Sequence, residues 1–112
     1  MMSWLSFFGL GNNEQKLQEA AQQVAKQARH RVWQRVNRRI ACMRVAEARG
    51  YVRARASILI EREVDNIMHR SRAFKPSERQ QVCRLALNMV VRLVQAQARI
   101  AYPPESRQKQ VA

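Results

Sequence analysis

Glycine, proline, cysteine and acidic residues are all scarce in this chain of 112 residues. It contains 3 Gly, 3 Pro and 2 Cys. So few glycines and prolines exclude a collagen-like chain and a proline-rich low-complexity chain. Two cysteines are too few for a disulfide-rich secreted scaffold or for a zinc site built on cysteine. The 8 acidic residues stand against 21 Lys and Arg, which gives a formal net charge of +13.

Apolar residues and arginine are what the chain has in quantity. Hydrophobic residues make up 46% of it, which is enough to form a core despite the charge. The length suits one small domain. Nine arginines and a single acid, Glu47, lie in residues 29–55, so this stretch carries most of the excess charge. Such a field favours polyanions: nucleic acid, anionic lipid or an acidic protein surface.

The middle of the chain has the pattern of a long helix. Residues 14–72 contain no proline and one glycine, Gly50, and Asn12 or Asn13 can cap the start. We predict a basic helix over 14–72 that is bent or broken near Gly50, because glycine weakens a helix and the apolar stripe drifts there. Apolar residues recur at helical spacings of three and four. The two stripes are Leu17, Ala21, Val24, Ala28, Val32, Val36 and Ile40, then Ala41, Val45, Ala48, Val52, Ala56, Ile60, Val64 and Ile67.

A second amphipathic helix is predicted after a turn at residues 73–77. Ser77 followed by Gln80 has the spacing of a capping box, and prolines after residue 101 end the helix. We expect one side of helix 78–101 to pack and the other to be solvated. The predicted packing residues are Val82, Ala86, Met89, Leu93, Ala96 and Ile100; the predicted polar ones are Gln81, Arg84, Asn88, Arg92, Gln95 and Arg99.

Together these elements predict an all-α fold. The long basic helix folds back on the second helix, as a helical hairpin or a three-helix bundle. We expect an apolar N-terminal segment at 1–11, a single helical domain at 12–101 and a disordered tail at 102–112. A domain this small buries little core, so we also expect a homo-oligomer or a subunit of a complex.

An arginine-rich face is the main candidate for a binding site. On an ideal helix, six arginines between positions 31 and 53 fall within about one third of the circumference. Such a ridge would follow a phosphate backbone or a layer of lipid headgroups, and its binding would depend steeply on salt. The alternatives are a solvated face and a face paired with an acidic protein partner. The six are Arg31, Arg35, Arg38, Arg39, Arg49 and Arg53.

Residues 1–11, MMSWLSFFGLG, form an apolar segment. It is shorter than the roughly 20 residues that span a bilayer, and it lacks the basic start of a secretory signal. We therefore expect a cytoplasmic protein, with the inner face of a membrane as the alternative location. The bulky side chains would either insert at a membrane interface or pack on the bundle or a partner subunit. These candidate docking residues are Trp4, Leu5, Phe7, Phe8 and Leu10.

The chain carries no pattern typical of a catalytic, metal or cofactor site. Asp65 and His69 share a helical face with Glu61, but a metal needs three or four ligands and no second carboxylate–His unit exists. There is no glycine-rich phosphate loop and no nucleophile elbow. Cys42 and Cys83 have no flanking motif, and we expect them to be buried as small apolar residues. We predict no enzymatic activity, no metal and no cofactor.

The resulting functional hypothesis is a binding protein that engages nucleic-acid phosphates, in DNA or RNA, with little sequence specificity. No zinc finger or RNP-like pattern supports base reading, and Trp33 is the only aromatic residue in 29–50. We expect Trp33 to serve packing. The alternative hypothesis is a peripheral membrane or assembly subunit, anchored by its apolar N-terminus. In that case the same arginines would hold it on anionic lipid or an acidic partner.

Overall fold

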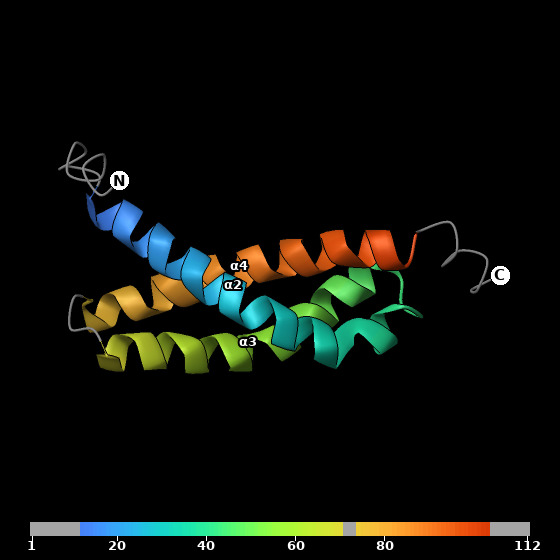
Figure 1. Ribbon diagram of the computed structural model, residues 1–112, viewed down its shortest axis with the longest axis horizontal. Helices are drawn as coiled ribbons and strands as arrows, with labels where there is room; N and C mark the ends of the chain where they lie inside the picture. The colour runs from blue at the N-terminus through green and yellow to red at the C-terminus, as the bar shows by residue number, and fades with distance from the viewer. Residues whose placement is uncertain (1–11, 71–73, 104–112) are drawn as a thin grey trace.

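The computed structural model describes residues 12–70 and 74–103, and in these residues it contains three α-helices and no strand. They are α2 (Asn12–Ile40), α3 (Val45–Arg70) and α4 (Pro76–Ala101). Figure 1 shows that α2 and α4 run in one direction and α3 in the other, with α2 crossing the other two at an angle. Each helix contacts both of the others. The all-α class is confirmed, and the arrangement is that of a three-helix bundle.

The predicted break near Gly50 is in the wrong place. The chain reverses at residues 41–44, where the N–H of Cys42 donates to the carbonyl of Arg39 and the N–H of Met43 to that of Ile40, at 3.2 and 3.1 Å. Gly50 lies inside α3. No described residue has a positive φ, so this turn needs no glycine. The sequence therefore contains no glycine that would indicate a turn at residues 41–44. Reversal at this point lets the first apolar stripe pack against the second, which a continuous rod would leave exposed.

The core is built mainly from valine and alanine. Every residue of the first predicted stripe is buried, which confirms the prediction for α2. The second predicted stripe is buried from Ala48 to Val64, but Val45 is 40% exposed, and Ala41 in the turn and Ile67 in α3 are half-buried. The buried residues are Leu17, Ala20, Ala21, Val24, Ala25, Ala28, Val32, Val36, Ile40, Ala48, Val52, Ala56, Leu59, Ile60, Val64, Val82, Ala86, Val90, Val91, Val94 and Ala98.

The predicted packing side of α4 is only half right. Val82 and Ala86 are buried and Met89 is half-buried, but Leu93, Ala96 and Ile100 are exposed. In the second half of the helix Val90, Val91, Val94 and Ala98 are buried instead. The reason is that α4 is apolar around much of its circumference and lies against two neighbours, so tertiary packing chooses which apolar side faces inward. A strip of apolar side chains is left outside the core.

The start of α4 also differs from the prediction. The N-cap is Lys75, two residues before Ser77, and Pro76 occupies the first turn, where its fixed φ suits a helix. Glu78, and not Gln80, closes the cap: its Oε1 accepts a hydrogen bond from the backbone N–H of Lys75 at 2.7 Å. Glu78 is also the one buried charged residue among those described.

Candidate functional site

The six predicted arginines are all exposed, but the structure does not place them on one helix. The reversal at 41–44 leaves four of them on α2 and two on α3. Arg31 Nη1 lies 3.4 Å from Glu63 Oε1 on α3, so Arg31 lies at the boundary between α2 and α3. Arg53 Nη2 donates to Asn88 Oδ1 on α4 at 2.9 Å, so Arg53 lies at a different boundary of the bundle. Arg49 precedes Arg53 by four residues and so shares its side of α3. The single ridge expected from a continuous helix is therefore split.

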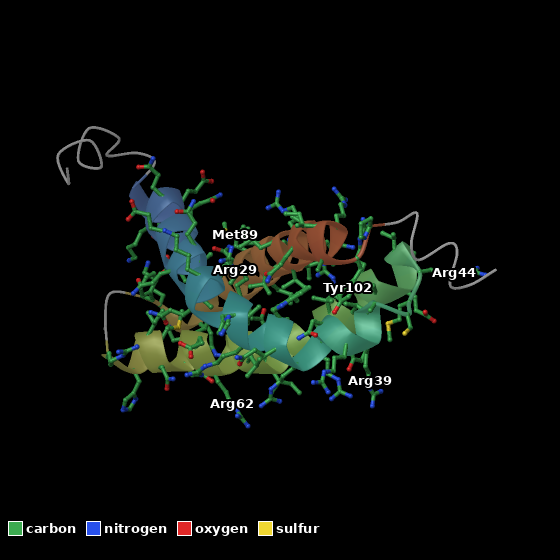
Figure 2. The ribbon with its side chains drawn as sticks, turned by 45° about the vertical axis from the view of Figure 1, so that its right-hand side comes forward. Arg29, Arg39, Arg44, Arg62, Met89 and Tyr102 are labelled. Carbon is green, nitrogen blue, oxygen red and sulfur yellow. The ribbon has the colours of Figure 1, made fainter. Side chains whose placement is uncertain are left out.

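The four arginines of α2 stay together. Arg31, Arg35, Arg38 and Arg39 follow each other at spacings that keep them on one side of a helix, and Arg31 shows that this side adjoins α3. Arg38 and Arg39 lie in the last turn of α2, where the helix dipole favours cations. Figure 2 shows Arg39 extending away from the bundle.

The arginines of α3 on the same side were missed by sequence reasoning. Arg55 and Arg62 are both exposed and lie seven residues apart, which is two helical turns. Figure 2 shows Arg62 pointing outward along the same edge of the bundle as Arg39. Arg70 and Arg31 line an open polar groove between α2 and α3. The other residues of this groove are Gln27, Glu63, Asn66 and His69.

The turn between α2 and α3 adds to this basic surface. Arg44 lies in the turn, is exposed, and projects from the end of the bundle in Figure 2. Glu47, in the first turn of α3, is the one acid nearby in the sequence. We call the combined region the α2–α3 basic surface. It comprises Arg31, Arg35, Arg38, Arg39, Arg44, Arg55, Arg62 and Arg70.

Most of this positive charge has no acidic partner within the part of the chain that the structure describes. Two ion pairs form there: Arg31 with Glu63, and Arg79 with Asp65 outside the basic surface. Arg55 lies over the ring of Tyr51, 5.4 Å from its centroid, and Arg70 Nε donates to the carbonyl of Asn66 at 3.3 Å. The remaining guanidinium groups of the surface face solvent. They are Arg35, Arg38, Arg39, Arg44 and Arg62.

The acidic side chains of α3 are not arranged as a metal site. Across 12–70 and 74–103, no three His, Cys, Asp or Glu side chains come close enough to hold a metal ion. Asp65 pairs with Arg79, which holds the pKa of its carboxyl below the usual value. The two cysteines differ from the prediction because neither is fully buried: Cys42 is in the exposed turn and Cys83 is half-buried. Partial burial raises the pKa of the Cys83 thiol, so it stays protonated.

The apolar and aromatic candidate residues form two groups. Trp4, Leu5, Phe7, Phe8 and Leu10 lie outside the described residues. Trp33 is half-buried and stacks on Tyr102, with ring centroids 6.3 Å apart and an interplanar angle of 27°. None of the three helices combines the length and the apolar character that crossing a bilayer requires.

The arrangement places guanidinium groups, which can donate hydrogen bonds to anionic oxygens, on two neighbouring helices and their turn. No protein-family model, no characterised protein and no solved structure matches this chain.

Proposed function

We propose that the protein binds DNA or RNA through the phosphate backbone, with the α2–α3 basic surface as its binding site and without enzymatic activity. The observation that carries this proposal is the accumulation of exposed, unpaired guanidinium groups across two adjacent helices and their turn. The planar guanidinium fork can donate two hydrogen bonds to one phosphate, which a lysine ammonium cannot do with the same geometry. Of the 21 basic residues in the chain, 17 are arginine.

The shape of the bundle suits binding along a backbone. The longest helix, α2, has 29 residues and is about 44 Å long, which corresponds to about 13 base pairs of duplex at 3.4 Å per pair. Rigid helices hold the backbone of the arginines in place, so little backbone freedom is lost on binding. Each phosphate contact releases counterions, and affinity should fall steeply as salt rises. The arginines would contact phosphates and not base edges, which gives little sequence specificity.

Two triple variants test the proposal. Each removes three positive charges, one from the α2–α3 basic surface and the other from α4. Arg35→Gln, Arg38→Gln and Arg39→Gln remove three arginines from the basic surface. Binding to a labelled duplex, followed by fluorescence anisotropy over a salt series, should weaken at least about tenfold, and the salt slope should fall by about 2 to 3. The matched control variant, which removes three exposed arginines from α4, should change binding much less. Its substitutions are Arg84→Gln, Arg92→Gln and Arg99→Gln.

Equal weakening by the two triple variants would show that net charge alone drives binding, and would contradict a defined surface. A parallel sedimentation series with anionic liposomes examines the membrane alternative. Liposome binding that survives rising salt and disappears when residues 1–11 are deleted would replace the nucleic-acid proposal with a membrane one. Salt-sensitive duplex binding that is unaffected by this deletion supports the nucleic-acid proposal.

A further inference from the structure

Along α4, five apolar side chains form a continuous strip beside the core. They recur at spacings of four, four, three and four, so on an ideal helix they lie within an arc of about 80°. Leu93 is 36% exposed and Ile100 is 84% exposed. The first two residues of the strip are half-buried and packed against the core. We call this strip the α4 apolar stripe; it comprises Leu85, Met89, Leu93, Ala96 and Ile100.

The stripe differs from the other exposed apolar residues that the structure describes. Val45 and Ile58 are also exposed, but both belong to α3 and are thirteen residues apart. Isolated apolar residues are ordinary on protein surfaces, whereas a stripe with helical spacing indicates a contact surface. Two residues beyond Ile100, Tyr102 stacks on Trp33 of α2, so an aromatic pair lies at the end of the stripe. Interfaces are enriched in such aromatic residues.

The charged residues beside the α4 apolar stripe restrict which partner can bind to it. Arg92 and Arg99 are exposed and lie within about 40° of Leu85 on an ideal helix, along one edge of the stripe. From Arg79 to Tyr102 the chain has no Asp or Glu. A second copy of the chain would bring the same arginines and another net charge of +13 to the interface. An acidic partner would instead gain attraction there.

We propose that the α4 apolar stripe is a docking site for an amphipathic helix of another protein, in which acidic residues flank the apolar face. The apolar face of the partner would pack on Leu93 and Ile100, the most exposed side chains of the stripe. Its flanking carboxylates would pair with Arg92 and Arg99. This surface is separate from the α2–α3 basic surface, so nucleic acid and the partner helix can bind at the same time.

The test uses the full chain and a labelled synthetic peptide of about three heptads, with leucine on one face and glutamate on both flanks. Its control has the same composition in scrambled order and no apolar face. Fluorescence anisotropy should show binding of the amphipathic peptide at least about tenfold tighter than of the scrambled one. The double variant Leu93→Gln, Ile100→Gln should lose most of this preference, because both anchors become polar. Arg92→Gln with Arg99→Gln should weaken binding and reduce its salt dependence.

Ile58→Gln is the matched control variant. It replaces an apolar side chain that is 56% exposed on α3, and peptide binding should be unchanged. Circular dichroism should show that all these variants stay folded, because the substituted residues are exposed. Duplex binding by the Leu93, Ile100 double variant should be normal, which distinguishes failure at this site from failure of the basic surface.

Three results would overturn the proposal. Equal binding of the scrambled peptide would mean that net charge alone attracts it. Concentration-dependent dimerisation that is lost in the Leu93, Ile100 double variant would identify a second copy as the occupant. Peptide binding that appears only after deletion of residues 1–11 would mean that this segment of the same chain covers the stripe.

Discussion

Arg79 of α4 binds Asp65 of α3 at two points: Nε donates to Oδ1 at 2.6 Å and Nη2 donates to Oδ2 at 3.2 Å. The pair joins the end of one helix to the start of the next, fourteen residues further along the chain. The hydrogen bond from Arg79 lowers the pKa of the Asp65 carboxyl. Because the Asp65 side chain is 58% exposed, solvent screens the pair and its contribution to stability is small.

Replacing Asp65 by Asn should lower the stability slightly at pH 7 and not at all in acid. A depressed pKa in the folded state gives stability that is present above the ordinary value of 3.8 and is lost as the pH falls below it. Urea unfolding at pH 7 and at low pH measures the difference between the variant and the parent chain. Glu47→Gln is the control, because Glu47 is exposed and forms no ion pair within residues 12–70 and 74–103. If Asp65→Asn lowers the stability by the same amount at both pH values, the result would contradict a role for the Asp65–Arg79 ion pair.

Glu78 should also contribute to the acid sensitivity of the fold. Its carboxylate accepts the backbone hydrogen bond of Lys75, and this bond, with Lys16 of α2 nearby, holds the pKa of Glu78 below 4.5. The stabilisation is complete above pH 4.5 and is lost as the pH falls through the lowered pKa. Glu78→Gln should destabilise the protein at pH 7 and flatten its stability profile in acid. Urea titrations at several pH values test this, and an unaltered acid slope would show that other groups control it.

Gly50→Ala should stabilise the protein. Gly50 is exposed inside α3, and a Cβ placed there would meet no heavy atom within 4 Å. Alanine in a helix interior is favoured over glycine by about 0.5–1 kcal/mol, partly because it restricts the unfolded chain. Thermal and urea unfolding should both show this gain. A loss of stability would indicate that the helix must bend at residue 50, as the sequence pattern first suggested.

Two isoleucines that are two residues apart, on opposite sides of α3, provide a matched test of the core. Ile60 is 1% exposed and Ile58 is 56% exposed. Ile60→Ala should cost about 2–5 kcal/mol in the free energy of unfolding, because it removes buried methyl groups and leaves a cavity. Ile58→Ala should change stability by less than about 0.5 kcal/mol. Similar losses from both substitutions would mean that α3 is rotated about its axis.

The spacing of apolar residues along the sequence was sufficient to predict much of the fold. The first stripe, from Leu17 to Ile40, was predicted residue by residue, because α2 has one apolar side and helical spacing specifies it. The second stripe was predicted well between Ala48 and Val64 for the same reason. In α4 the prediction failed after Ala86, because two apolar sides were available and only contact with α2 and α3 decides between them.

By itself, the sequence determined the helical class, the residues that form most of the core and the concentration of arginine in 29–55. These properties depend on composition and on spacing along one helix. Tertiary structure alone decided that the chain reverses at 41–44 and that Arg53 faces α4 while Arg31 faces α3. It also decided that Ile100 is left in solvent. The physical reason is that each of these outcomes depends on which helix lies beside which, and no local pattern contains that information.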